Sequence, residues 1–430
     1  MRPVVRALPK NTMRLLPFIA AVAALLGPAP ALPAPDRVQQ PSLAAAPVPG
    51  QQRVQVLVAD LRDLMQRLAG LPQVAGLSAV LVYEGEVVLA EGFGVTDVAT
   101  GQEVDADTVF RLASLSKAFA ATVAAHLVRE GVITWDTPVQ PMLPGLVLAN
   151  PEDTSRLTVR DVLSHRVGLP FNALDRRLEA DEPYPLLVQT LQSVPMTCRV
   201  GECFGYQNVA FSLIGDLVFA TTGHFYSFEV EKRIFTPLGM RTATHGREAL
   251  ESNGNWARPH VLRNGRLAVV TPKDTYYRVA PAAGINASAR DLGQWLIAQM
   301  GGFPDVLPPE MLAELHTPLV ETPYEIRGNG WRRQRLRSAW YGLGWRIMDY
   351  AGERMIFHAG AVQGYRGMLG FLPDRRFGVA FLWNSETNIP AGLLPVAMDR
   401  FLGLPETDWI ELDRLLHAHR AAPARRTRQH

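Results

Sequence analysis

The sequence predicts a mixed α/β (α+β) fold, with an antiparallel sheet built from N- and C-terminal segments and flanked by helices. Two observations predict it. Runs rich in β-forming residues lie near both ends of the folded part, at residues 77–94 and 354–384. The stretch between them, about residues 136–296, has mainly helical periodicity. This stretch is therefore expected to form a helical insertion lobe, and the cleft between the two parts is the natural place for a site.

Residues 1–31 are typical of a secretory signal peptide. Basic residues precede the apolar stretch Leu15–Gly27, which is too short to span a bilayer comfortably, and Ala29-Pro30-Ala31 offers an A-x-A cleavage site. An uncleaved membrane anchor is the alternative. Residues 32–52 are rich in Pro and Ala and predict a flexible linker. We therefore expect a protein secreted across the inner membrane into the periplasm, with no integral membrane span after cleavage.

The spacing of apolar and β-forming residues predicts the first elements of the folded part. Apolar residues recur at helical spacing over residues 54–68 and predict a first helix. Two β-rich runs joined at Glu84-Gly85 predict a hairpin. Residues 114–130 predict a second helix, which Gly131 ends.

Strand signals return late in the chain. Three runs between residues 354 and 384 predict strands, and residues 390–402 predict a closing helix. We expect the folded domain to cover residues 53–405. Residues 406–430, which end in the basic stretch "HRAAPARRTRQH", are expected to form a partly disordered tail.

The overall composition excludes some classes of protein. The 43 Lys and Arg residues nearly balance 41 Asp and Glu, for a net charge of +2, and no long basic stripe supports binding to nucleic acid. The sharpest basic cluster, residues 327–337, predicts a solvated loop or hairpin. The ten His residues show no H-E-x-x-H pattern, so we expect neither a metal nor another cofactor. The sequence does not specify an oligomeric state.

The segment "FRLASLSK" contains a lysine in a chain that uses only four lysines among its 43 basic residues. Lys117 follows Ser114 by three positions, so on a helix the two side chains meet. Arg cannot give up its proton, whereas a desolvated Lys near the positive end of a helix can. The pattern thus predicts a nucleophilic Ser114 activated by Lys117. The alternative is a surface lysine on a helix of small residues.

Two further motifs carry candidate site residues. Tyr206 and Asn208 lie in a turn that enters an apolar helix ending at Gly223, where a capping Asn beside a packed Tyr is the plainer interpretation. His358 and Gly360 stand at the end of a predicted strand. We expect the glycine to let a substrate backbone lie against the strand edge.

In order and spacing, S-x-x-K, Y-x-N and H-x-G resemble the motifs of the serine β-lactamase and DD-peptidase (penicillin-binding protein-like) superfamily, in its class C-like branch. The resemblance covers about residues 54–403 and implies a β-lactamase/transpeptidase-like fold. The further local likenesses are "LTVRDVLSHRVGLP" (157–170), "IFTPLGM" (234–240), "PAAGINASARDLGQWL" (281–296) and "YGLGW" (341–345).

The resemblance implies a role for each motif residue. Ser114 is the acylated nucleophile, and Lys117 and Tyr206 share the proton transfers. A tyrosine acts as a base only when nearby cations lower its pKa, and we expect Lys117 to do so. Asn208 should hydrogen-bond Lys117 or the substrate amide.

The strand motif is expected to complete the site. His358 should orient the substrate and complete the network around Tyr206. Because His titrates near neutrality, activity should show an apparent pKa in the histidine range. Gly360 and Ala361 are expected to contact substrate, and the backbone N–H groups of Ser114 and Ala361 should form the oxyanion hole.

The resemblance implies an exported serine hydrolase that acts through an acyl-enzyme on D-amino-acid peptides, or on related amides and esters. Its substrate would be a small peptide, ester or lactam, including peptidoglycan-derived peptides. Two alternatives share the fold: a class C-type β-lactamase and a carboxylesterase. An alternative of another class is a non-catalytic protein that binds cell-wall peptides.

The two cysteines, Cys198 and Cys203, stand just before Tyr206. In a cytosolic protein they would be reduced thiols or half of a metal site, whereas export favours a disulfide. Gly201 provides the flexibility that so short a ring needs. We expect the bridge to fix the approach to Tyr206.

Overall fold

The computed structural model describes residues 49–328 and 330–421 of the 430-residue chain. The expected signal peptide and nearly all of the expected linker lie outside these residues. The first helix, α1 (Pro49–Ala69), begins within the linker predicted to extend to residue 52. That boundary is wrong because Pro49 is compatible with the first helical position and residues 50–52 continue the helix.

The fold centres on one eight-stranded sheet with the strand order β2-β1-β13-β12-β11-β10-β9-β8, in which neighbouring strands are antiparallel. β1 pairs directly with β13, from Leu77↔Trp383 to Tyr83↔Phe377. The N- and C-terminal segments therefore form one sheet, as predicted. The strands are β1 (Gly76–Tyr83), β2 (Glu86–Gly94), β8 (Val320–Glu321), β9 (Leu336–Tyr341), β10 (Arg346–Tyr350), β11 (Glu353–Val362), β12 (Tyr365–Leu372) and β13 (Phe377–Trp383).

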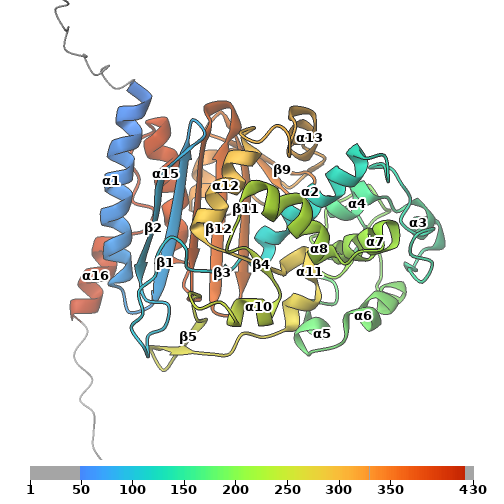
Figure 1. The fold of residues 1–430 in the computed structure, drawn as a ribbon, viewed down its shortest axis with the longest axis horizontal. Helices are drawn as coiled ribbons and strands as arrows, with labels where there is room; N and C mark the ends of the chain where they lie inside the picture. The colour runs from blue at the N-terminus through green and yellow to red at the C-terminus, as the bar shows by residue number, and fades with distance from the viewer. Residues whose placement is uncertain (1–48, 329, 422–430) are drawn as a thin grey trace, which may run out of the picture. The chain divides into compact units, whose positions relative to one another are not determined.

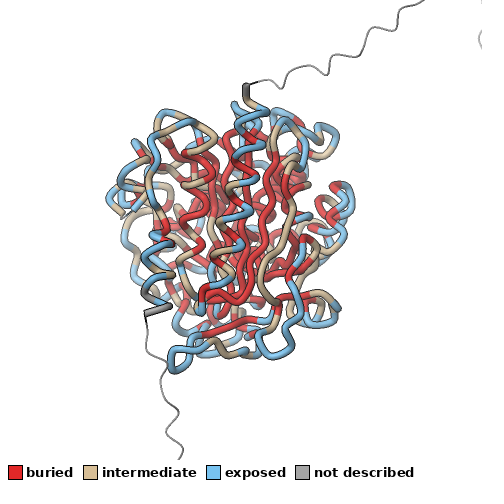
Figure 2. The backbone as a smooth tube through the Cα atoms, turned by 90° about the vertical axis from the view of Figure 1, so that its left-hand side faces the viewer, coloured by how far each residue is buried: buried red, intermediate tan, exposed pale blue. Residues whose placement is uncertain are grey.

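Side chains of the central strands alternate between two hydrophobic cores. On β13, Phe377, Val379 and Phe381 pack on the outer face, while Ala380 and Leu382 pack on the inner face. The outer face is covered by α1 and α15 (Leu393–Leu402), and the inner face by α12 (Ala289–Gln299) and α2 (Ser116–Arg129) (Figure 1). Figure 2 shows the buried strands behind the more exposed outer helix. Burial on both faces explains why these strands read as almost continuous apolar runs.

The chain continues to fold beyond the predicted boundary at residue 405. Helix α16 (Leu412–Ala421) lies where a partly disordered tail was expected. Ile410 and Leu412 are buried against the outer core, and the indole N–H of Trp409 donates to Asp399 at 2.9 Å. The predicted boundary is therefore wrong, because two apolar residues and a tryptophan anchor this segment. Residues 422–430 lie outside the described residues.

The central part of the chain is mainly helical, but it is shorter than predicted. Its expected end, near residue 296, falls within α12, which packs on β1, β2 and β13 and so belongs to the layer of the sheet. The helices before α12 are α3 (Pro151–Arg156), α4 (Val159–Leu163), α5 (Asp175–Glu179), α6 (Tyr184–Thr190), α7 (Leu213–Thr222), α8 (Tyr226–Val230), α9 (Thr236–Leu238), α10 (Arg247–Glu251) and α11 (Ala280–Ala283).

Short elements that the sequence did not indicate complete the fold. A hairpin and a small three-stranded sheet, ordered β3-β7-β4, lie within or beside the helical part. These elements are β3 (Phe110–Arg111), β4 (Thr244–His245), β5 (His260–Arg263), β6 (Arg266–Val269), β7 (Ile285–Ala287) and α13 (Pro309–Leu315).

The basic cluster at residues 327–337 is not the solvated loop or hairpin that was expected. It contains the short helix α14 (Trp331–Arg335) and the start of β9. Arg332 pairs with the buried Glu325 at 2.5 Å, and Arg335 pairs with the buried Asp399 at 2.8 Å. Arg332 and Arg335 are thus bound by carboxylates from other parts of the fold. The local charge pattern of the sequence cannot predict these ion pairs.

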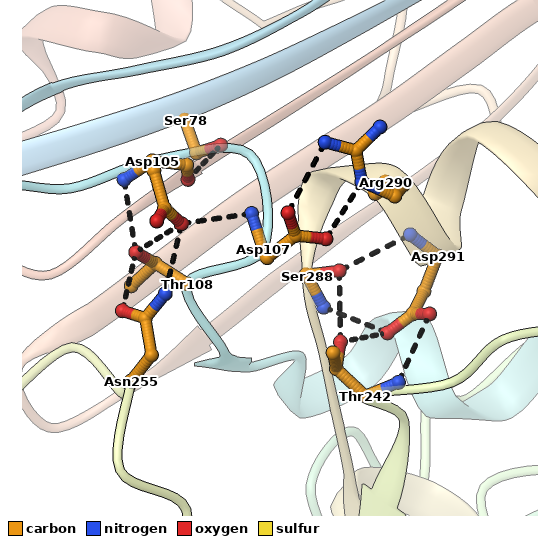
Figure 3. Close-up of polar contacts among 9 residues, drawn as sticks. All are labelled: Ser78, Asp105, Asp107, Thr108, Thr242, Asn255, Ser288, Arg290 and Asp291. Atoms are coloured by element: carbon orange, nitrogen blue, oxygen red, sulfur yellow. Dashed lines mark hydrogen bonds and ion pairs between the residues drawn. The ribbon is translucent and has the colours of Figure 1, made fainter.

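Polar contacts fix the start of α12 (Figure 3). The Ser288 hydroxyl accepts a hydrogen bond from the Asp291 backbone N–H at 3.2 Å, and the Asp291 carboxylate accepts one from the Ser288 N–H at 3.2 Å. This capping box is joined by Thr242, whose hydroxyl donates to Asp291. Arg290 pairs with Asp107 at 2.6 Å. These bonds hold α12 between the helical part and the sheet.

Candidate active site

The predicted nucleophile, Ser114, lies in a 3-10 turn, η1 (Ala113–Leu115), immediately before α2. The residue before it, Ala113, has a φ of +50°, a conformation that costs a non-glycine residue energy. Such strain is often found at functional sites. The turn places Ser114 at the positive end of the helix, one turn from Lys117.

Gly360 packs directly against this turn. A Cβ atom at Gly360 would lie 2.2 Å from the Leu112 carbonyl oxygen and 3.2 Å from the Ser114 backbone nitrogen. The glycine is therefore required because the protein's own backbone approaches it. The expectation that Gly360 also lets a substrate backbone lie against the strand edge stays a prediction. The contact holds β11 and the Ser114 N–H together, which an oxyanion hole shared by Ser114 and Ala361 would need.

Lys117 is completely buried. Its Nζ lies 3.3 Å from Ser114 Oγ, 2.7 Å from Asn208 Oδ1 and 3.2 Å from the Ala282 carbonyl oxygen. Burial lowers the pKa of Lys117 well below its ordinary value, against an opposing effect of Asp175. A neutral amine has two N–H groups, which can donate to the Asn208 and Ala282 oxygens. Its lone pair is then left to accept from the Ser114 hydroxyl. The arrangement can accept the Ser114 proton.

Tyr206 lies beside Lys117, whose Nζ is 4.6 Å from the centre of the ring. Burial raises the pKa of Tyr206 to about 12, although a hydrogen bond with Ser114 and the charge of Arg346 act to lower it. The expectation that Lys117 lowers this pKa is therefore wrong, because desolvation dominates and Arg346 is the opposing cation. In the free protein Tyr206 is a proton donor.

His358 is buried behind the site. Its Nδ1 lies 2.8 Å from the Ala359 carbonyl oxygen, so Nδ1 carries the proton and Nε2 accepts from the Tyr341 hydroxyl at 3.0 Å. Burial, with Arg346 and Lys117 nearby, lowers the pKa of His358 well below its usual range. The expected titration near neutrality is therefore wrong. Tyr341, which binds His358, lies between the two motifs, and its ring centre is 6.4 Å from that of Tyr206.

A cavity of about 390 Å³ brings together five of the predicted site residues, Ser114, Tyr206, Asn208, Gly360 and Ala361. Lys117 and His358 do not line it. A larger cavity, of about 620 Å³, lies between α1, α15 and α16, and no predicted site residue lines it. We therefore place the candidate site in the smaller cavity.

Strand β11 offers an unpaired edge at this cavity. β10 pairs only with residues 353–357 of β11, whereas β12 continues to Val362. Residues 358–362 therefore have a strand neighbour on one side only. An extended peptide can add to such an edge through main-chain hydrogen bonds.

Arg346 is a site residue that sequence reasoning missed. Its guanidinium lies 5.7 Å from the centre of the Tyr206 ring and 5.6 Å from that of Tyr341. It pairs with the buried Glu325 and donates to the Tyr324 hydroxyl at 3.2 Å. The only local signal is that Arg346 directly follows "YGLGW", and a lone arginine there does not reveal its distant partners.

Asp175 was missed as well. It lines the cavity and accepts a hydrogen bond from Asn208 Nδ2 at 2.7 Å. Burial raises the pKa of Asp175, while Asn208 and Lys117 act to lower it. It lies 31 residues before Tyr206 in the sequence, outside each of the three motifs, and so has no local signature.

Cys198 and Cys203 form the expected disulfide, with Gly201 at a φ of +88° between them. Just beyond it, the Gly205 N–H donates to the His165 carbonyl oxygen at 2.9 Å, and the Gln207 N–H donates to His165 Nδ1 at 3.1 Å. These bonds hold the backbone on both sides of Tyr206.

A metal site would need several ligating side chains close together within the part of the chain that the structure describes. No group of three or more His, Cys, Asp or Glu side chains gathers there in a way that could hold a metal ion.

Similarity to known proteins extends over most of the chain. A family model described as Beta-lactamase matches residues 61–395. An unguisins hydrolase, UngD′ of Aspergillus campestris (strain IBT 28561), is 24% identical over 330 residues, covering 74% of this chain and 60% of that protein. The chain thus spans about 60% of the length of the first curated relatives it matches.

Two solved structures share the architecture. The octameric penicillin-binding protein homologue from Pyrococcus abyssi superposes with a TM-score of 0.72 at 24% identity, covering 83% of this chain and 79% of that one. The D-amino acid amidase from Ochrobactrum anthropi SV3 has a TM-score of 0.65 at 22% identity, covering 82% of this chain and 98% of that one. At these identities the two structures establish the fold alone.

Proposed function

Because the chain belongs to the beta-lactamase family, we propose that it is a serine hydrolase, which forms an acyl-enzyme at Ser114 and hydrolyses D-amino-acid peptides or related amides and esters. One observation carries the proposal. Lys117 is buried without an ion pair among the described residues, and its Nζ lies 3.3 Å from Ser114 Oγ with two carbonyl oxygens occupying its other contacts. This arrangement suits a neutral lysine that accepts a proton.

The proposed reaction runs in two halves. The Ser114 hydroxyl proton passes to Lys117 Nζ as Oγ bonds to the substrate carbonyl carbon, and the oxyanion is bound by the N–H groups of Ser114 and Ala361. The carbon–leaving-group bond then breaks, and the leaving group takes the proton from the Lys117 ammonium through Tyr206. Water next attacks the acyl-enzyme carbonyl by the same transfers in reverse, which frees the acid and restores Ser114.

The substrate class rests on the shape of the site. The unpaired edge of β11 at residues 358–362 suits a ligand with a peptide backbone. The solved D-amino acid amidase with this fold makes a D-aminoacyl amide or peptide the first substrate to test. A class C-type β-lactamase and a carboxylesterase need the same nucleophile, so substrate comparison must separate them.

Mass spectrometry of the intact protein tests the acyl-enzyme directly. Incubation with a fluorophosphonate probe or a β-lactam should add the mass of one adduct, located on Ser114, and Ser114→Ala should carry none. Turnover of a D-Ala-D-Ala peptide, a D-amino acid amide, nitrocefin and a p-nitrophenyl ester then ranks the activities. The absence of any adduct and any turnover would overturn the proposal, and retained peptide affinity in Ser114→Ala would then favour a binding protein.

Export to the periplasm is also proposed, supported by the basic and apolar pattern of residues 1–31. Within the described residues, no helix has the length and apolar character needed to cross a bilayer. N-terminal sequencing of protein from a periplasmic extract should begin near residue 32. Material that keeps Met1 and stays with the membrane fraction would show an anchor instead.

A further inference from the structure

We propose that Asp175 is a positioning residue for acylation, which fixes the orientation of the Asn208 amide and so keeps Lys117 directed at Ser114. The idea rests on the proposed function, because it assigns a role in the transfer of the Ser114 proton. Asp175 belongs to none of the three motifs and stands at the start of α5.

The geometry joins Asp175 to the nucleophile through two side chains. Asn208 Nδ2 donates to Asp175 Oδ2 at 2.7 Å, and Lys117 Nζ donates to Asn208 Oδ1 at 2.7 Å. An ionised carboxylate only accepts hydrogen bonds, so it selects the NH₂ end of the amide. The carbonyl end must then face Lys117. A flipped amide would set two acceptors against each other and an NH₂ group against the amine.

This orientation determines what Lys117 can do. With the Asn208 and Ala282 oxygens both accepting, a neutral Lys117 has no N–H left for Ser114 and offers it the lone pair. With the amide flipped, one N–H would be released and the lone pair would turn away from the serine. Asp175 thus acts on the reaction without contact with the reacting atoms.

Asp175 is not held as a structural ion pair. It is 9% exposed, and within the described residues its Oδ1 has no hydrogen-bond partner and its carboxylate has no salt bridge. A buried carboxylate with one hydrogen bond and no ion pair costs desolvation energy, so it is not there to stabilise the fold. The position is better explained by the amide that it orients.

The charges around the pair set the expected pH response. Asp175 acts to raise the pKa of Lys117, Arg346 acts to lower it, and burial dominates. The other titratable groups facing Lys117 or Asp175 are Tyr206, His165, His358, Glu179 and Tyr276. Of these, Tyr206 has its pKa raised to about 12, and the pKa values of His165 and His358 are lowered well below the usual range. Removing the Asp175 charge should therefore lower the Lys117 pKa further.

The test is the pH dependence of Ser114 acylation by a fluorophosphonate probe in Asp175→Asn. Acylation needs neutral Lys117, so its rate falls as pH drops through the Lys117 pKa. In the variant this acid limb should move about one unit to lower pH, because a nearby opposite charge is lost. The plateau rate should fall about tenfold, because the amide is free to take either orientation. Asp175→Glu should keep the acid limb of the wild type.

Asp216→Asn provides a matched control. Asp216 lies in the same helical part, burial raises its pKa, and it accepts from the Tyr184 hydroxyl at 2.7 Å outside the cavity. Its acylation profile should equal that of the wild type. An unshifted acid limb and an unchanged plateau in folded Asp175→Asn would overturn the proposal, with Asp175→Ser as the substitute if that variant does not fold. Failure of the wild type to acylate would instead overturn the proposed function.

Discussion

Two buried carboxylates on opposite sides of the sheet differ in the number of hydrogen bonds that they accept. Asp399, on α15, accepts hydrogen bonds from Arg335 at 2.8 Å, the Tyr350 hydroxyl at 2.6 Å and the Trp409 indole at 2.9 Å. Asp175, at the cavity, accepts one bond, from Asn208. Both are at least nine-tenths buried. A carboxylate that serves packing is saturated with donors, whereas one beside a reactive group keeps acceptor capacity unused.

The same contrast separates the two regions as a whole. At the outer face, Asp399 of α15 accepts hydrogen bonds from Arg335 of α14, from Tyr350 of β10 and from Trp409, which precedes α16. At the cavity, Lys117 is buried without a carboxylate, and His165 Nε2 has no partner among the described residues. The outer region should therefore govern stability and the cavity region should govern rate. Four measurements test this division of roles between the two regions.

The largest effect is expected from Lys117→Arg. Arginine keeps the positive charge but cannot release its proton, so kcat/KM should fall about 10³- to 10⁴-fold. Acylation by a fluorophosphonate probe measures the loss, and circular dichroism confirms the fold. Lys232→Arg, an exchange at an exposed residue, is the control. Activity above a tenth of the wild-type value would mean that Lys117 is not the proton acceptor.

Asp399→Asn should lower the stability of the protein rather than its activity. Removing this charge leaves the mostly buried Arg335 without its ion-pair partner, so the free energy of unfolding should fall by about 3 kcal/mol. Asp175→Asn should lower it by less than about 1 kcal/mol. Urea denaturation measures the free energy of unfolding of both variants. Equal losses would erase the distinction between the two carboxylates.

Acid should weaken the cores through their histidines. Burial lowers the pKa of His126 to about 4 and that of His316 to about 3, from an ordinary 6.5. The unfolded chain therefore binds protons first as pH falls below 6.5. Stability present above pH 6.5 should drop by about 2–4 kcal/mol by pH 5. Denaturant titrations at pH 7, 6 and 5 measure this, and His316→Asn should show a shallower fall. A flat dependence would contradict the lowered pKa values.

The smallest effect is expected from the disulfide. The double variant Cys198→Ser/Cys203→Ser should lose about 2 kcal/mol of stability or less by loop-entropy reasoning. Its kcat/KM should fall about tenfold, because the backbone around Tyr206 is held less firmly. Peptide turnover and melting temperature are the two measurements. Unfolded, unreduced wild-type protein should titrate about zero thiols, and two thiols in periplasmic material would contradict the bridge.

The helices and strands that depend on a local pattern of apolar residues were predictable from the sequence. The apolar run of β13 appears as a strand that is buried on both faces, and the helical spacing of α1 appears as a helix packed in the outer core. The motif residues Ser114, Tyr206 and Asn208 meet at one cavity, because each motif lies on a turn that the neighbouring helix fixes. Local patterns therefore located most of the candidate site.

The remainder depends on partners distant in sequence. Arg346 and Asp175 acquire their roles from Glu325, Tyr206 and Asn208, which no spacing rule connects to them. The expectation for His358 failed because burial and its tautomer are set by Tyr341 and a backbone carbonyl. The folded segment that includes α16 was missed because Trp409, just before the helix, binds Asp399 on another helix. Such contacts exist only in the folded chain.

The pairing of β1 with β13 has a consequence for how this protein is made. Leu77 pairs with Trp383, which is far along the chain, so the contact order of the central sheet is very high. A high contact order slows folding. At a synthesis rate of about 5–20 residues per second, β13 follows β1 by roughly 15–60 s. Throughout that interval β1 exposes an unpaired strand edge, which invites aggregation and chaperone binding. The N–H groups of Ser114 and Ala361, which we propose as the oxyanion hole, therefore come together only after β11 has been synthesised.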